Sequence, residues 1–261
     1  MSGDTRPIGV FDSGCGGVST LIEIARLLPA EDLIYYGDQA FAPYGTRDEG
    51  YVLDRAETVT RLLLGLKVKA LVIACNTATA AAAKTLRAEY TLPIIGIEPA
   101  VKPASLLKQD GLVLCMATPG TLKSDKFHLL ISRFGEVTPL PCPGLMELVE
   151  AGGAGLKETD EYLEKLFKPY REEKIDAVVL GCTHYVFLKE KIVSFFGGRV
   201  PVVDGNEGTA RQLGRRLTEC GLTAPEDHRG SVTFMTSGGE EDIRRMERLF
   251  GGCCTAPRTK I

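Results

Sequence analysis

Two short segments of this chain look like copies of one another, and they constrain the fold more than any other feature. Residues 68–77 read Val-Lys-Ala-Leu-Val-Ile-Ala-Cys-Asn-Thr, and residues 175–184 read Ile-Asp-Ala-Val-Val-Leu-Gly-Cys-Thr-His. Each begins as an apolar, β-branched run, which is typical of a buried parallel strand. Each run ends in a cysteine, Cys75 or Cys182, and polar residues and a helical pattern follow. The sequence therefore predicts two related halves, each with a thiol at the carboxyl end of a strand, where open α/β sheets bind ligands.

The rest of the chain alternates predicted strands and helices, as in a parallel sheet with crossover helices. The predicted strands, besides the two runs before the cysteines, are 8–11, 33–36, 93–97, 112–116, 137–140, 201–203 and 231–236. The predicted helices are 18–28, 48–65, 78–89, 121–133, 145–151, 159–173, 186–195, 209–221 and 240–250.

The duplication sets the expected domain organisation. Pro-Ile-Ile-Gly at 93 and Pro-Val-Val-Asp at 201 follow the two cysteines at nearly the same offset, which strengthens the interpretation as a repeat. We predict an α/β protein of two pseudo-symmetric parallel-sheet domains with the active site in the cleft between them. The first domain is discontinuous, 1–97 plus 208–261, because the last three elements are expected to pack back on it. The second is 98–207.

Composition excludes several classes of partner. The formal net charge of −3 gives no electrostatic reason to expect nucleic acid or an anionic membrane. No run approaches the ~18 apolar residues of a membrane span, and the first residues show no apolar signal segment. We expect a cytoplasmic protein with a small-molecule substrate, no nucleic acid and no membrane.

The eight cysteines do not suggest a metal site. They lie at 15, 75, 115, 142, 182, 220, 253 and 254, with no Cys-x-x-Cys pair and only three histidines in the chain. Zinc sites usually show paired ligands at close spacing. We predict no metal, and expect most of these thiols to be reduced and several to be buried. Cys253 and Cys254 read as accidental oxidation targets.

The glycine-rich turn after the first strand is not a nucleotide motif. Gly14-x-Gly16-Gly17 lacks the third glycine of the dinucleotide fingerprint, because Ser19 stands there, and no lysine follows as in a phosphate loop. A tight strand-to-helix turn explains it. Asp12 and Ser13 then stand as a carboxylate and a hydroxyl at a strand end, and we interpret them as site groups.

Both cysteines also have a purely structural interpretation, since cysteine is among the most buried residue types. Their repeated contexts favour function, and a helix N-terminus lowers the pKa of a thiol. His184 is placed to tune or orient Cys182, although a lone histidine is more often structural. Neutral donors at the same turns can cap helices or hold a carboxylate. They are Asn76, Thr77, Thr118, Thr121 and Thr183.

Taken together, these motifs resemble the glutamate racemases, cofactor-independent enzymes of bacterial cell-wall synthesis. The resemblance rests on motifs that agree in order from residue 8 to about 220. They are Phe-Asp-Ser-Gly-x-Gly-Gly (11–17), Asp38 with Pro-Tyr-Gly (43–45), Ala-Cys-Asn-Thr-Ala (74–78), Ala-Thr-Pro-Gly-Thr (117–121), Cys-Pro (142–143), Leu-Val-Glu (148–150) and Leu-Gly-Cys-Thr-His-Tyr (180–185).

The resemblance implies residue roles. Cys75 and Cys182 would be the two acid/bases, with Asp12 assisting Cys75 and His184, supported by Glu150, assisting Cys182. Glu147 is a competing candidate for the support of His184. The implied substrate-contacting groups are Asp12, Ser13, Tyr44, Gly45, Asn76, Thr77, Thr183 and His184. No cofactor is expected, the substrate would be glutamate, and we expect a homodimer.

The chemistry agrees with two thiols. Racemisation inverts Cα, so a proton must leave one face and arrive on the other, which one thiolate and one thiol can do. Without pyridoxal phosphate, the carbanion must be stabilised by desolvation and oriented dipoles. Two alternatives stay open at this point: another racemase of the same superfamily, acting on aspartate or a hydantoin, and a non-catalytic protein that binds a dicarboxylate.

Overall fold

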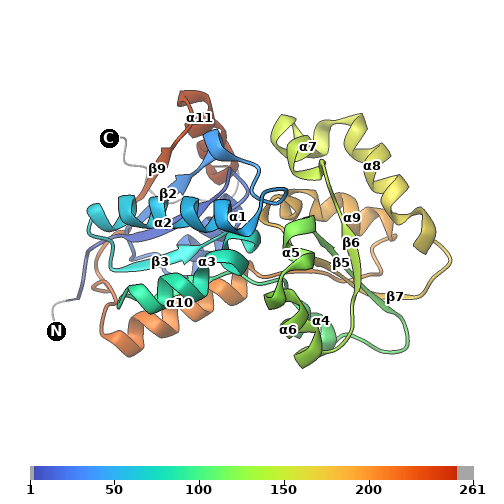
Figure 1. Ribbon diagram of the computed structural model, residues 1–261, viewed down its shortest axis with the longest axis horizontal. Helices are drawn as coiled ribbons and strands as arrows, with labels where there is room; N and C mark the ends of the chain where they lie inside the picture. The colour runs from blue at the N-terminus through green and yellow to red at the C-terminus, as the bar shows by residue number, and fades with distance from the viewer. Residues whose placement is uncertain (1–2, 252–261) are drawn as a thin grey trace. The chain divides into compact units, whose positions relative to one another are not determined.

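The computed structural model describes residues 3–251, apart from the side chain of residue 154 (Figure 1). Cys253 and Cys254 lie outside the described residues. The chain divides into two compact units. Unit 1 takes the described parts of Met1–Ile97 and Asn206–Ile261, and unit 2 is Glu98–Gly205. Each unit contains its own parallel sheet, so the predicted pair of parallel-sheet α/β domains is confirmed.

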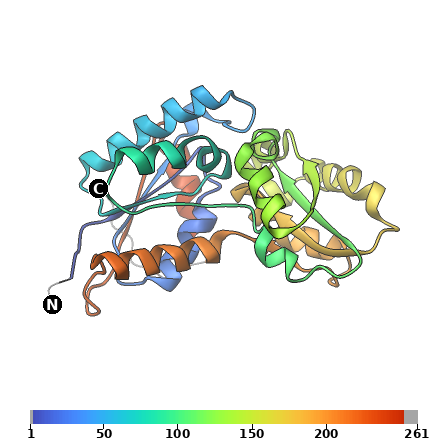
Figure 2. The ribbon, with the colours of Figure 1, turned by 60° about the horizontal axis from the view of Figure 1, so that its bottom comes forward.

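Unit 1 is built on a five-stranded sheet of order β4-β3-β1-β2-β9, in which every pairing is parallel. Its strands are β1 (Ile8–Asp12), β2 (Leu33–Gly37), β3 (Ala70–Ile73), β4 (Ile94–Gly96) and β9 (Val232–Thr236). Its helices are α1 (Val18–Leu27), α2 (Glu49–Gly65), α3 (Asn76–Glu89), α10 (Asn206–Cys220) and α11 (Glu240–Gly251). Helices α2 and α3 pack together, and α1 contacts α10 and α11; Figure 2 shows α2 and α3 on one face of the sheet and α10 on the other.

Unit 2 is built on a four-stranded parallel sheet of order β6-β5-β7-β8. Its strands are β5 (Leu112–Ala117), β6 (Thr138–Pro141), β7 (Ile175–Leu180) and β8 (Val202–Asp204). Its α-helices are α4 (Val101–Ser105), α5 (Pro119–Lys123), α6 (Asp125–Phe134), α7 (Leu145–Ala151), α8 (Lys157–Phe167) and α9 (Lys189–Phe195).

The two sheets repeat one topology. In unit 1, β4 follows Cys75 along the chain, and starting from it the sheet (sheet 1) runs β4-β3-β1-β2. In unit 2, β8 follows Cys182, and starting from it the sheet (sheet 2) runs β8-β7-β5-β6. Strands β3 and β7, which precede Cys75 and Cys182, therefore occupy equivalent positions beside the first strand of each unit. Strand β9 is an addition at the outer edge of β2, and residues 223–251 belong to unit 1.

Alternating side chains explain why β5 and the second half of β7 are apolar. Along β5, Val113 and Cys115 join a core cluster with α4 and α6, whereas Leu114 and Met116 join a cluster with α7, α8 and α9. Along β7 the same alternation holds. Because helices cover both faces of a parallel sheet, both sets of side chains are buried and no polar face is left.

Three helix predictions in the second half are wrong in detail. The predicted helix 121–133 is two helices, because Ser124 adopts an extended conformation and its hydroxyl caps α6 through Phe127 N. The predicted helix 159–173 ends as α8 at Phe167, and a 3₁₀ turn containing Pro169 follows it, since proline cannot donate to a helix interior. Helix α4 was not predicted, because Pro103 interrupts its short pattern.

The third wrong helix prediction lies directly after Cys182. The predicted helix 186–195 is a 3₁₀ stretch, Thr183–Leu188, followed by the shorter α9. Cys75, by contrast, caps an α-helix that already begins at Asn76, earlier than the predicted residue 78. The two cysteine-bearing turns are therefore similar in sequence and topological position but differ in backbone conformation.

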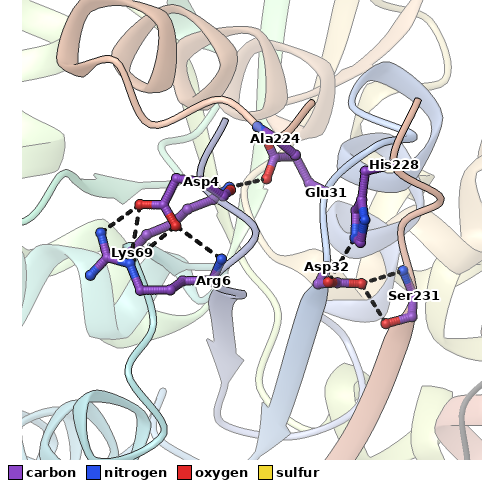
Figure 3. A network of polar contacts seen from close by, with 8 residues as sticks. All are labelled: Asp4, Arg6, Glu31, Asp32, Lys69, Ala224, His228 and Ser231. Carbon is purple, nitrogen blue, oxygen red and sulfur yellow. Dashed lines mark hydrogen bonds and ion pairs between the residues drawn. The ribbon is translucent and has the colours of Figure 1, made fainter. Parts of the chain in front are cut away.

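Polar contacts tie the segment between α10 and β9 to the amino end of sheet 1 (Figure 3). The Asp32 carboxylate accepts hydrogen bonds from Ser231 N (2.8 Å) and Ser231 Oγ (2.6 Å), and His228 Nε2 lies 2.9 Å from it. Glu31 accepts from Ala224 N at 2.9 Å and pairs with Lys69 Nζ at 2.5 Å. Among the described residues, no helix is long and apolar enough to cross a membrane.

Candidate active site

The first group of predicted site residues lies at the carboxyl edge of sheet 1. Strand β1 ends at Asp12, and the turn after β3 carries Cys75. The Cys75 sulfur lies 3.7 Å from Ser13 Oγ and accepts a hydrogen bond from Ala78 N at 3.4 Å. The contact with Ala78 is an N-cap, in which sulfur satisfies an amide at the positive end of α3. The structure therefore brings Cys75 and Ser13, which both follow strand ends, within hydrogen-bonding reach of one another.

Asp12 is held by the glycine-rich turn. Its side chain is fully buried and accepts a hydrogen bond from Gly14 N at 3.1 Å. A Cβ atom on Gly17 would stand 2.6 Å from Asp12 Cβ, so this position needs glycine. Tyr35 fixes the turn from β2, because its hydroxyl donates to Gly14 O at 2.7 Å. The glycines thus allow the backbone of the turn to approach Asp12 closely. Nothing in the sequence near Tyr35 indicates its contact with this turn.

Tyr44 lies in the same part of unit 1, on the loop after β2. It is fully buried, and its hydroxyl donates to Asp38 Oδ2 at 2.5 Å. Burial, together with the hydrogen bond to the Asp38 carboxylate, raises the pKa of Tyr44 well above its ordinary value. The Tyr44 phenol is therefore neutral, and its O–H group is engaged in the hydrogen bond to Asp38. Gly45 follows it and is buried, as are Asn76 and Thr77 on the turn after Cys75.

The second group of predicted site residues lies at the carboxyl edge of sheet 2. The Cys182 sulfur is 3.8 Å from His184 Nδ1, and His184 Nε2 is 2.9 Å from Glu150 Oε1 on α7. Because an ionised carboxylate can only accept, Nε2 carries a proton, and in the neutral form of the ring Nδ1 is the acceptor that faces the thiol. His184 is 1% exposed, so its tautomer is set by protein groups. Of the two glutamates considered, the structure brings Glu150 to His184.

Threonine side chains lie at two turns of unit 2. Thr118 caps α5 by accepting from Thr121 N at 3.2 Å, and the two threonine hydroxyls are 3.0 Å apart. Thr183 follows Cys182 and is buried. Thr118 is therefore a helix cap in this structure. Capping uses a lone pair of the Thr118 hydroxyl, and its proton is donated to Thr121 Oγ1.

Two other buried cysteines, Cys115 and Cys142, lie in the core of unit 2. Burial raises the pKa of Cys115 to about 12. Burial also raises the pKa of Cys142, with a further increase from the neighbouring Cys182, and its thiol contacts the Leu140 carbonyl oxygen at 3.2 Å. Tyr185 donates to Cys142 O at 3.0 Å, which fixes the segment beside Cys182. Both Cys115 and Cys142 are therefore neutral core thiols.

Comparison with known proteins gives the family. The model of the Asp/Glu/Hydantoin racemase family matches residues 8–213. This is most of the chain. The chain belongs to that racemase family. A glutamate racemase of Clostridium botulinum (strain Alaska E43 / Type E3) is 44% identical over 252 residues, which is 95% of this chain and 98% of the relative.

Solved structures of racemases share the fold. A glutamate racemase isoform of Bacillus anthracis has a TM-score of 0.86 and 30% identity, and the match covers 98% of this chain and 97% of that one. A glutamate racemase of Francisella tularensis subsp. tularensis SCHU S4, solved in complex with D-glutamate, has a TM-score of 0.82 and 29% identity over 99% of this chain and 98% of that one. The resemblance inferred from the sequence motifs is thereby confirmed at the level of family and fold.

Sequence reasoning missed two polar residues that the racemase places at the edge of sheet 1. Asp38 appeared only as part of a motif, yet it is fully buried and receives the Tyr44 hydroxyl. Arg55 carried no signal, because an arginine in an amphipathic helical pattern is expected to be solvated. Its guanidinium nitrogens Nε and Nη2 each lie 3.0 Å from an Asp38 oxygen. Only the contact across 17 residues of chain identifies this arginine.

Proposed function

We propose that this protein interconverts L-glutamate and D-glutamate without a cofactor, with Cys75 and Cys182 as acid/bases on opposite faces of Cα. The observation that carries the proposal is the equivalence of the two cysteines. Each follows the strand that lies beside the first strand of its sheet, and each has a polar partner within hydrogen-bonding reach of sulfur. By contrast, burial raises the pKa of Cys115 and Cys142, which favours the neutral thiol at both positions.

The proposed reaction uses one proton on each face. One cysteine, as thiolate, removes the α-proton of one enantiomer, and the other, as thiol, delivers a proton to the opposite face of the carbanion. The protonation states of the pair are then reversed, which suits the reverse reaction. Asp12 is proposed to assist Cys75, and His184, oriented by Glu150, to assist Cys182. The residues proposed to contact the substrate are Ser13, Tyr44, Gly45, Asn76, Thr77, Thr118, Thr121 and Thr183.

Several features support glutamate as the substrate. The relatives that cover nearly the whole chain are glutamate racemases, and one structural neighbour is a complex with D-glutamate. Neutral hydroxyls and amides at strand-to-helix turns can hold carboxylates through hydrogen bonds and helix dipoles. By the family resemblance, the D-glutamate formed would supply peptidoglycan. A homodimer remains our expectation for its assembly.

The test of the activity is circular dichroism of glutamate solutions. Purified protein, without pyridoxal phosphate and with EDTA, is expected to bring both L- and D-glutamate to zero optical activity and to leave aspartate unchanged. Inversion of aspartate instead would transfer the activity to the alternative substrate. Binding of glutamate without inversion would leave only a dicarboxylate-binding protein. Activity that is lost on chelation and restored by zinc would contradict the metal-free reaction.

The test of the mechanism is exchange of the α-proton with deuterium, followed by NMR. Cys75→Ala and Cys182→Ala should both abolish racemisation, because each lacks one face of the reaction. The Cys182 variant should slowly exchange only D-glutamate, and the Cys75 variant only L-glutamate. Cys115→Ala is the matched control, since it removes another buried thiol and should keep full activity. If either of the first two variants racemised at the wild-type rate, its cysteine would be a core residue.

A further inference from the structure

An arginine of helix α2 forms a two-pronged ion pair with a carboxylate of the loop after β2. Arg55 Nε lies 3.0 Å from Asp38 Oδ2, and Arg55 Nη2 lies 3.0 Å from Asp38 Oδ1. The Asp38 side chain is fully buried, and that of Arg55 is 17% exposed. Such a paired fork fixes both the distance and the plane of the carboxylate, which a lysine cannot do. The position of Asp38 is therefore set by α2.

The same carboxylate receives the Tyr44 hydroxyl. The bond is 2.5 Å long and ends on Oδ2, the oxygen that also accepts from Arg55 Nε. Since Tyr44 is fully buried, its phenol has no water to replace Asp38 as an acceptor. A buried polar group that loses its partner pays the full cost of desolvation. Any displacement of Asp38 would therefore move Tyr44 and the residue after it, Gly45.

Two further contacts hold the middle of this loop against α2. The Arg55 guanidinium carbon stands 3.5 Å from the centre of the Phe41 ring, within the range of a cation–π contact. Tyr51, also on α2, donates its hydroxyl to Phe41 O at 3.2 Å. Residues 38–41 are thus attached to α2 through Arg55 at Asp38 and through Arg55 and Tyr51 at Phe41, and Tyr44 at the end of the loop is held through Asp38.

The held end of the loop packs beside the first catalytic cysteine. Tyr44 and Cys75 belong to one core cluster, together with residues of α2 such as Val52 and Val59. A shift of Tyr44 would therefore be felt at the turn that carries Cys75, because close-packed cores transmit displacements rather than absorb them.

We propose that Arg55 is a positioning residue for the substrate site, acting through Asp38 to fix Tyr44 and Gly45. The inference rests on the proposed glutamate racemisation, in which Tyr44 and Gly45 contact the substrate. Arg55 itself touches no reacting atom. Its removal should therefore weaken the binding of both glutamate enantiomers more than it slows proton transfer, since misplaced binding groups raise KM whereas interactions made only in the transition state lower kcat.

The experiment compares Arg55→Met with two controls on the same helix, in the full chain, by steady-state racemisation of L- and D-glutamate and by thermal unfolding. Arg55→Met should raise KM for both enantiomers about tenfold or more, with a smaller fall in kcat. The reason is that losing hydrogen bonds between charged groups typically weakens an interaction by on the order of tenfold or more. Arg61→Met removes an exposed arginine paired with Glu57 and should change neither constant. Val59→Ala removes packing from the same core cluster and should lower Tm with a smaller rise in KM than Arg55→Met.

Arg55→Lys keeps the positive charge but loses the paired fork. It should raise KM by about threefold, since a single contact replaces two. If Arg55→Met does not fold, the KM of Arg55→Lys tests the proposal in its place. An unchanged KM in Arg55→Lys or Arg55→Met would overturn the proposal. So would an equal rise in Val59→Ala, because the effect would then follow stability alone. Failure of the wild-type protein to racemise glutamate would instead remove the proposed function, so the two failures are distinguishable.

Discussion

The pair formed by Lys69 and Glu31 should be essential for the stability of unit 1, and Lys69→Met tests this. The Lys69 side chain is 0% exposed and that of Glu31 is 4% exposed, with 2.5 Å between Nζ and Oε2 (Figure 3). Lys69 Nζ also donates to the carbonyl oxygen of Asp4. The other Glu31 oxygen accepts from Ala224 N. Methionine fills the space of the lysine stem but leaves the Glu31 carboxylate buried without its counter-charge.

The expected loss follows from this burial. Removing one member of a buried ion pair typically costs about 3–5 kcal/mol, because the remaining charge keeps its desolvation penalty without compensation. At about 2–4 °C per kcal/mol for a chain of this size, Tm should fall by roughly 6–20 °C. Adding Glu31→Gln removes the orphaned charge while its amide oxygen can still accept from Ala224 N. The double variant should therefore regain at least about 1 kcal/mol relative to Lys69→Met.

The assay is thermal and urea unfolding followed by circular dichroism, on the two single variants and the double variant. Lys157→Met is the matched control. It makes the same substitution in an exposed pair, with side chains 86% and 65% exposed, and should have no measurable effect. A fall in Tm for Lys69→Met no larger than for Lys157→Met would refute the reasoning. So would a double variant as unstable as the sum of the two single changes, because the pair would then contribute nothing as a pair.

Two further predictions concern the polar contacts of each unit. In racemisation assays, Glu150→Gln should lower kcat about tenfold or more, because it removes the charge that orients His184. Glu147→Gln should leave kcat unchanged. An equal effect of the two variants would contradict the assignment of Glu150 as the residue that orients His184. Since the enantiomers have equal free energy in water, kcat/KM must fall equally in both directions. For Asp32, burial raises its pKa but hydrogen bonds from Ser231 and His228 outweigh burial, so the pKa lies below its ordinary value. The stability that ionised Asp32 contributes is therefore present above its ordinary pKa and is lost as pH falls through the lowered, folded-state pKa. Urea unfolding across pH should show Asp32→Asn less stable than wild type near neutrality, with the difference closing in acid. A difference in stability that stays constant with pH would contradict this prediction.

Regular structure was the part most accessible from the sequence. The strands before Cys75 and Cys182 could be predicted because a strand buried on both faces is an uninterrupted apolar run. The strand ends could be predicted as the site because the carboxyl edge of a parallel sheet is set by chain direction. The conformation after Cys182 could not, since the choice between a 3₁₀ turn and an α-helix over a few residues depends on how the following side chains pack.

What the sequence by itself determined is local: where apolar runs begin and end, which polar residues follow them, and the repeat that relates the two halves. Tertiary structure decided the partners of those residues. Arg55 is paired with Asp38 and Lys69 with Glu31, and Glu150 rather than Glu147 reaches His184. A charged side chain has the same local pattern whether it is solvated or paired, because its partner lies elsewhere in the chain. Only the packing of distant segments around these groups excludes water from them and makes each partner necessary.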